Sequence, residues 1–170
     1  GLCVAGTHGK TTTSSMLAFL LDQSSWKCNA FLGGIATNFQ SNLVLNKGSE
    51  FTVIEADEFD RSFLHLSPYA SIITAADPDH LDIYGTAEQF KEGFRQFAMK
   101  LDPNGICLQK EGLNLQSLGK TFTYAVDSET ADYAVTNFSW LDGFLCGDVR
   151  LKNTWWKEVK FGLPGIHNAE

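Results

Sequence analysis

The chain has 170 residues, enough for one sizeable domain, and its 44% apolar and 19% charged residues exclude a disordered or low-complexity protein. Its formal charge of -7 comes from 13 basic and 20 acidic residues. The sequence has no cluster of lysine and arginine of the kind that is typical of nucleic-acid binders. Local geometry, and not a broad positive surface, must therefore bind any polyanionic ligand.

The cysteines and the apolar runs further limit the class of protein that this chain can be. The spacing of Cys3, Cys28, Cys107 and Cys146 matches neither a CxxC redox pair nor a zinc site, so we expect reduced thiols. The longest apolar run, Met16–Leu21, is far too short to span a membrane, and no signal peptide precedes it. We expect a cytoplasmic protein with no membrane or nucleic-acid partner, and the oligomeric state stays open.

Short apolar runs alternate with helical patterns through about residue 119, which is typical of a mostly parallel α/β sheet flanked by helices. The second helix begins with a capping-box pair, Thr86 and Gln89, and ends at the turn 102–105. The predicted elements are, in chain order, a strand at 2–5, a helix at about 11–22, strands at 51–54 and 71–74, the helix after Thr86, and a strand at 106–109.

The pattern changes beyond about residue 120. Four segments, 121–126, 133–140, 144–151 and 155–161, alternate apolar with polar residues, and a hairpin dipeptide, Asp-Gly, separates the second from the third. They predict a small antiparallel sheet over about 120–162, packed beside the parallel one. Residues 163–170 end in what we expect to be the start of a helix.

The first polar cluster is the glycine-containing turn 6–12, between a buried strand and a helix. Its backbone N–H groups and the positive end of the helix dipole suit phosphate. Lys10 can reach terminal phosphate oxygens, and Thr11 can bind Mg²⁺. The strict P-loop pattern is not met, because Val4 occupies the position of its first glycine. An ordinary glycine turn that caps a helix is the alternative.

Two further clusters follow strands. Glu55 begins the acidic run 55–60, where a carboxylate beside a phosphate loop can bind Mg²⁺; a solvated acidic loop is the alternative. His80 ends the run 77–80, where histidine can bind a metal; an Asx-type turn is the alternative. Because the carboxyl ends of parallel strands share one edge of a sheet, the sequence predicts that Lys10, Glu55 and His80 share one site.

These motifs resemble those of a known family, the Mur ligases. The run 5–13 is similar to their shortened phosphate loop, in which a histidine at the place of His8 is typical of one branch. The runs 55–64 and 79–82 resemble the second and third motifs of that branch, and 163–168 resembles the family's P-G-x-H-N motif. The four matches span nearly the entire chain in the expected order.

The resemblance implies an enzyme, an ATP- and Mg²⁺-dependent ligase of peptidoglycan precursor synthesis. It implies that L-alanine is joined to the lactyl carboxylate of UDP-N-acetylmuramate through an acyl phosphate. It also implies that 1–170 is a central ATP-binding domain of P-loop type, and that an N-terminal UDP-binding domain and a C-terminal domain are missing. We expect such a fragment to be inactive alone.

Residue roles follow from the same resemblance. Lys10 and His80 are implied to be catalytic, and Thr11, Glu55 and His80 to bind magnesium. Asn38, at the end of a loop over 33–38, is implied to contact the UDP-sugar, although the arginine usual downstream is absent. The implied ATP contacts are Gly6, Thr7, His8, Gly9, Lys10, Thr11, Thr12, His167 and Asn168.

Four alternatives remain at this point. A related ligase that recycles murein tripeptide shares the branch motifs. A P-loop GTPase switch is suggested by the D-x-x-G match at 82–85, but the chain has no N-K-x-D guanine-reading motif. Folylpolyglutamate synthase shares the expected fold. A non-catalytic nucleotide-binding module leaves the metal-ligand types at three strand ends unexplained.

Overall fold

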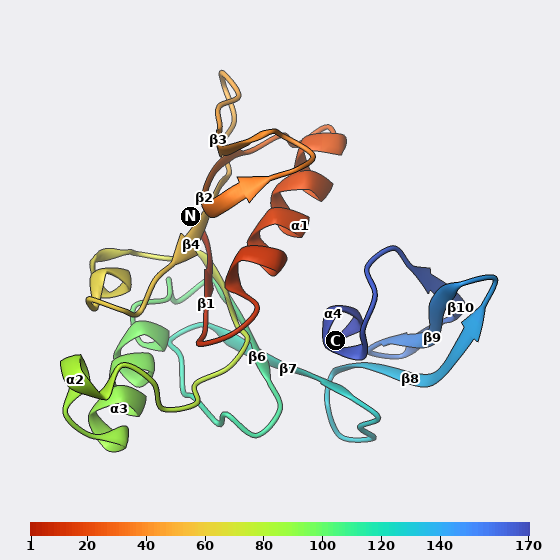
Figure 1. Cartoon of the computed structure of the whole chain (residues 1–170). Coiled ribbons are helices and arrows are strands. Elements are labelled where there is room, and N and C mark those ends of the chain that lie inside the picture. The colour runs from red at the N-terminus through yellow and green to blue at the C-terminus, as the bar shows by residue number, and fades with distance from the viewer. The chain divides into compact units, whose positions relative to one another are not determined.

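The structure is a computed structural model that describes all residues, 1–170, in two compact units (Figure 1). Unit 1 comprises residues 1–108 and 113–121, and unit 2 comprises residues 109–112 and 122–170. No helix is long and apolar enough to cross a membrane. All four cysteines are buried free thiols.

Unit 1 is built on a mostly parallel sheet, which confirms the predicted fold class. The central strand β1 runs parallel to β4 and β5 on its two sides, β4 is in turn parallel to β2, and β3 is antiparallel to β2. The strand order is β6-β5-β1-β4-β2-β3. The strands are β1 (Leu2–Ala5), β2 (Asn29–Ala36), β3 (Ser41–Val44), β4 (Thr52–Ala56), β5 (Ala70–Ile73) and β6 (Ile106–Lys110), of which the last begins in unit 1.

The strands β2 and β3 were not predicted, and the expected loop over 33–38 is wrong in part. Residues 33–36 complete strand β2, and only 37–40 form a turn. The pair Gly33-Gly34 hides the strand in the sequence, because glycine is depleted in strands and marks places where another group approaches the backbone closely.

Helices cover both faces of this sheet. Successive residues of β4 point to opposite faces. Val53 belongs to the buried cluster that includes Ala18 of α1 (Lys10–Gln23), whereas Ala56 belongs to the one that includes Phe94 of α3 (Ala87–Ala98). Two short elements join the α3 side, a 3-10 turn η1 (Ser62–His65) and α2 (Leu81–Tyr84). The layers leave the carboxyl ends of β1, β4 and β5 free to form a common edge.

The helix α3 forms for the reasons read from the sequence. The Thr86 side chain accepts a hydrogen bond from the Gln89 backbone N–H at 3.2 Å, which caps the helix as predicted. Phe90, Phe94 and Phe97 lie on one face at helical spacing and are fully buried. They fill the core between α3 and the sheet.

Unit 2 contains most of β7 (Lys120–Val126), whose first two residues belong to unit 1, together with β8 (Tyr133–Leu141), β9 (Phe144–Leu151), β10 (Thr154–Phe161) and the short helix α4 (Ile166–Ala169). The predicted antiparallel pairing is confirmed for β8 with β9 and for β9 with β10. It is wrong for β7, which runs parallel to β8. Only three residue pairs are in register, so the connection 127–132 suffices to return the chain to the start of β8.

A buried carboxylate fixes the shape of the antiparallel part. Asp148, on the middle strand β9, accepts hydrogen bonds from Asn137 Nδ2 at 2.8 Å and from the Glu158 backbone N–H at 3.1 Å. Asn137 and Glu158 both have positive φ and lie where the registers of β8 and β10 shift. One side chain thus holds a β-bulge on each neighbouring strand, which bends the sheet at that level.

Candidate functional site

The loop between β1 and α1 lies closely against the end of β5. Gly6 has a φ of 139°, and a Cβ there would lie 2.1 Å from Thr74 Oγ1 and 2.8 Å from the Ala75 backbone nitrogen. Thr74 Oγ1 donates to the carbonyl oxygen of His8, and the Thr7 backbone N–H donates to Ala75 O at 3.3 Å. Glycine is therefore required at position 6 by both backbone conformation and space.

The start of α1 presents unused donors to this loop. Gly9 precedes the helix in a left-handed conformation, no side chain caps the first turn, and no acidic residue lies in it. The first N–H groups of a helix have no partner within the helix, and the dipole there favours an anion. The side-chain oxygen of Thr7 is also buried without a hydrogen-bond partner. His8, Thr11 and Thr12 are exposed.

Lys10, the first residue of α1, is fixed by two acceptors. Its Nζ donates to the Gly6 carbonyl oxygen at 2.7 Å and to Glu58 Oε1 at 3.0 Å. Glu58 is only 1% exposed, although it belongs to an acidic run that the sequence alternative treats as solvated. Sequence reasoning missed Glu58, because the run contains four carboxylates and only the packing distinguishes the one that is buried.

Glu55, in β4, is surrounded by donors from two other elements. Its Oε1 accepts from Thr11 Oγ1 at 2.7 Å, and its Oε2 accepts from the Gly33 backbone N–H at 2.7 Å and from Ser14 Oγ at 3.3 Å. A Cβ on Gly33 would lie 2.4 Å from Glu55 Oε1. From the sequence, the segment 33–38 was expected to contact the UDP-sugar. In the structure, Gly33 of this segment contacts Glu55.

The donor set at Thr11 and Glu55 fits Mg²⁺. A hydroxyl and a carboxylate oxygen lie 2.7 Å apart beside the phosphate-type loop, and magnesium prefers oxygen ligands of which proteins supply only one or two. The structure contains no group of three or more His, Cys, Asp or Glu side chains that could hold a metal ion. These two residues would share the ion with phosphate oxygens and water.

His80 lies at the end of the segment that follows β5. Its ring packs edge-on against Phe59, with ring centroids 4.9 Å apart, and its Nε2 lies 3.8 Å from Asp79 Oδ2. Phe59 follows Glu58, the partner of Lys10, so two neighbouring residues connect Lys10 with His80 through their contacts. No direct contact joins His80 to Thr11 or Glu55, and its role as a metal ligand stays a prediction.

The remaining predicted residues lie in other elements. Asn38 is exposed in the turn after β2. His167 and Asn168 lie in α4 of unit 2, where Asn168 Nδ2 donates to Pro164 O at 2.6 Å. The contacts of these three residues with substrate and adenine stay predictions.

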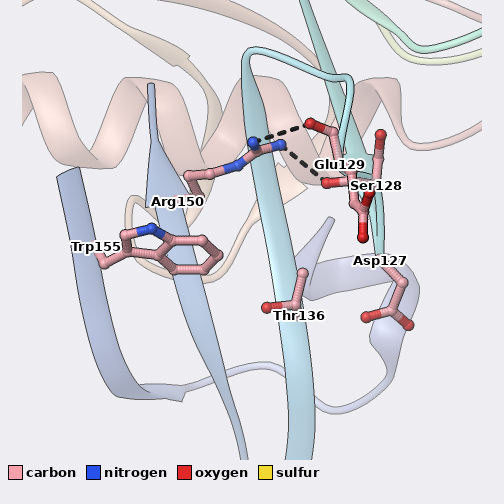
Figure 2. Close-up of a pocket in the computed structure, with 6 residues that line it drawn as sticks. All are labelled: Asp127, Ser128, Glu129, Thr136, Arg150 and Trp155. Atoms are coloured by element: carbon pink, nitrogen blue, oxygen red, sulfur yellow. Dashed lines mark hydrogen bonds between the residues drawn. The ribbon is translucent and has the colours of Figure 1, made fainter. Parts of the chain in front are cut away.

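Unit 2 has a hollow of about 360 Å³, shown in Figure 2. Its residues are Asp127, Ser128, Glu129, Thr136, Arg150 and Trp155. The Arg150 guanidinium donates to the carbonyl oxygens of Ser128 at 2.9 Å, Glu129 at 3.1 Å and Ala131 at 2.8 Å. Its N–H groups therefore hold the β7–β8 connection in place.

Comparison with known proteins gives consistent results. Residues 4–170 match the family model described as the Mur ligase middle domain. The UDP-N-acetylmuramate--L-alanine ligase of Parabacteroides distasonis is 54% identical over 174 residues, which cover 100% of the chain and 37% of that protein. The chain thus spans little more than a third of the length of such curated relatives.

Two solved structures share the fold over nearly the whole chain. The UDP-N-acetylmuramate-alanine ligase of Thermotoga maritima has a TM-score of 0.81 at 29% identity, covering 98% of this chain and 38% of that one. The UDP-N-acetylmuramate:L-alanyl-gamma-D-glutamyl-meso-diaminopimelate ligase of Neisseria meningitides has a TM-score of 0.83 at 28% identity, covering 98% and 56%.

Proposed function

Since the chain belongs to the Mur ligase family, as its middle domain, we propose that it supplies the ATP and Mg²⁺ site of a longer ligase. That ligase joins L-alanine to the lactyl carboxylate of UDP-N-acetylmuramate in peptidoglycan precursor synthesis. The observation that supports this most strongly is the contact of Thr11 with Glu55 beside the loop that fixes Lys10. N–H groups that can donate to phosphate, the Lys10 ammonium group and the Glu55 carboxylate lie close together there.

The chemistry of the proposed reaction needs these groups. The lactyl carboxylate attacks the γ-phosphorus of ATP to give an acyl phosphate and ADP, and the amine of L-alanine then attacks the acyl carbon as phosphate leaves. Bringing a carboxylate to a triphosphate places anions about 4 Å apart, where each unit pair repels by about 1 kcal/mol in water and about 4 kcal/mol near a protein surface. Catalysis of phosphoryl transfer consists largely of positioning and of compensating this charge.

Different residues of unit 1 bind phosphate, compensate its charge and hold Mg²⁺. The loop N–H groups and Thr7 bind phosphate oxygens, and Lys10 compensates charge on the transferred phosphoryl group. Glu55 and Thr11 hold Mg²⁺, which supplies further positive charge when bound. We propose that His80, whose ring contacts Phe59, acts near the acceptor carboxylate.

The alanine-adding reaction is preferred to tripeptide recycling because of the relatives. The L-alanine ligases of Parabacteroides distasonis and Phocaeicola vulgatus are 54% and 55% identical to this chain over its whole length. The two solved structures do not separate the two reactions, because the alanine ligase of Thermotoga maritima is 29% identical and the ligase of Neisseria meningitides is 28% identical. The same relationship disfavours a GTPase switch. Competition between ATP and GTP for binding to the chain distinguishes an ATP-dependent ligase from a GTPase switch. Stronger binding of GTP would contradict our proposal.

Two substitutions in the complete ligase test the site. We expect Lys10→Ala to lower turnover by about 10² to 10³, as loss of one preorganised charge partner does. We expect Glu55→Ala to raise the Mg²⁺ concentration needed for half-maximal rate. Lys47→Ala, at an exposed turn, is the control and leaves both values unchanged. Wild-type rate and Mg²⁺ dependence in both site variants would refute the assignment.

The isolated chain gives a separate test. We propose that residues 1–170 bind nucleotide but form no acyl phosphate, because the family's other two domains bring the two substrates. Trapping with hydroxylamine detects acyl phosphate directly. A hydroxamate product from this chain alone would overturn that part of the proposal.

A further inference from the structure

We propose that Glu58 is a positioning residue that holds the Lys10 ammonium group at the phosphate loop, an inference that rests on the function proposed above. The acidic run 55–60 contains four carboxylates, and Asp57 and Asp60 are exposed. Glu58 alone is completely enclosed, at 1% exposure. Its carboxylate is therefore not part of a solvated acidic loop.

The partner of this enclosed carboxylate is Lys10. Both oxygens lie near Nζ, with Oε1 at 3.0 Å and Oε2 at 2.9 Å. A buried charge is tolerated only when it is paired and hydrogen-bonded, so the two side chains fix each other. Their separation of 48 residues in the chain means that the packing of α1 against the end of β4 creates the pair.

The pair leaves Lys10 ready to bind a phosphate oxygen. An ammonium group has three N–H donors. The Gly6 carbonyl oxygen, at 2.7 Å, takes one, and Glu58 takes another. The third is free, and the Lys10 side chain is 15% exposed. A lysine on a flexible four-carbon stem is thereby held in one place before nucleotide arrives.

The backbone of Glu58 is fixed from the other side of unit 1. Its carbonyl oxygen accepts hydrogen bonds from Tyr84 Oη at 2.6 Å and from the Arg61 backbone N–H at 3.0 Å. Burial raises the pKa of Tyr84 to about 12, so its hydroxyl stays protonated and remains a donor. The Arg61 guanidinium lies over the Tyr84 ring, 4.7 Å from its centroid. Glu58 thus has a rigid support.

Loss of the Glu58 charge should separate turnover from binding. Glu58→Gln keeps the shape of the side chain and leaves the positive charge of Lys10 in place. Removal of a negative charge near the phosphates does not weaken their binding. The ammonium group is no longer held at one point, however, and misplacement of a catalytic charge reduces the rate of the chemical step.

The test uses the complete ligase and compares Glu58→Gln, Lys10→Ala and the double variant. We expect Glu58→Gln to lower kcat at least tenfold while the KM for ATP changes less than threefold. In the double variant, we expect the loss to equal that of Lys10→Ala alone, because Glu58 acts through Lys10. Glu88→Gln makes the same chemical change at the exposed Glu88–Arg95 pair and leaves kcat unchanged.

Different experimental outcomes contradict the positioning role of Glu58 and the proposed function. A Glu58→Gln enzyme with wild-type kcat, or losses that simply multiply in the double variant, would overturn the positioning role. A Lys10→Ala enzyme with wild-type activity would instead overturn the proposed function. If Glu58→Gln does not fold, as shown by its melting curve, Glu58→Asp replaces it. That variant keeps the charge but shortens the reach, so kcat must still fall with KM preserved, and wild-type kcat would overturn the inference.

Discussion

Replacing Gly33 by alanine displaces the Glu55 carboxylate without removing its charge. The new Cβ would lie 2.4 Å from Oε1 and 2.8 Å from Oε2, whereas ordinary contact begins at 3.4 Å. The carboxylate must therefore withdraw by about 1 Å, which breaks its 2.7 Å hydrogen bond from the Gly33 N–H. Because the displaced atoms are the end of a side chain, we expect the fold to adapt and the melting temperature to change little.

The catalytic effect should be much larger than the effect on stability. A misplacement of about 1 Å can cost about 10² in rate, which equals about 2.7 kcal/mol of transition-state stabilisation. We expect a decrease of this size in ATP-dependent ligation by the complete enzyme, together with a higher Mg²⁺ requirement. Initial rates measured over a range of Mg²⁺ concentrations, with a melting curve for each variant, give both quantities.

The neighbouring glycine provides the matched control. A Cβ on Gly34 would lie 3.5 Å from Thr11 Cγ2, an ordinary contact, and Gly34 does not have a positive φ. Gly34→Ala should therefore leave the rate within about twofold of wild type. If Gly33→Ala shows wild-type rates and Mg²⁺ dependence, then the position of Glu55 does not matter, and the reasoning about this site is wrong.

Two more predictions concern the loop and unit 2. Gly6→Ala should abolish nucleotide binding, as measured by calorimetry. The Cβ of the alanine would lie 2.1 Å from Thr74 Oγ1, and the backbone at this position has a φ of 139°. Normal affinity for nucleotide would show that the loop can rearrange. Hydrogen bonds from Lys157, Asn137 and the Glu158 N–H lower the pKa of Asp148 from 3.8 to about 2. The stability that Asp148 contributes is present above its unfolded pKa and is lost as pH falls from about 4 to about 2. Urea unfolding should show that Asp148→Asn is less stable than wild type at pH 7 and that the gap narrows through this window; a constant gap down to pH 2 would contradict the role of the charge.

The sequence was sufficient for the features that depend on neighbouring residues. The capping of α3 by Thr86, its row of phenylalanines and the glycine loop before α1 are local patterns, and each was predicted at the right place. The order of apolar runs and helices also predicted the mostly parallel sheet, because a parallel connection needs a crossover between its strands. The family resemblance followed from the same short motifs.

Tertiary structure decided the partners of the charged residues. Glu55 is held by Gly33, and Lys10 by Glu58, across 22 and 48 residues of sequence. These contacts exist because β4 lies between β1 and β2 in the sheet, an order that no local pattern encodes. The parallel pairing of β7 with β8 was likewise hidden, because it involves only three residue pairs. Periodicity in the sequence shows which face of an element is buried; the packing of strands far apart in the chain determines which charges meet.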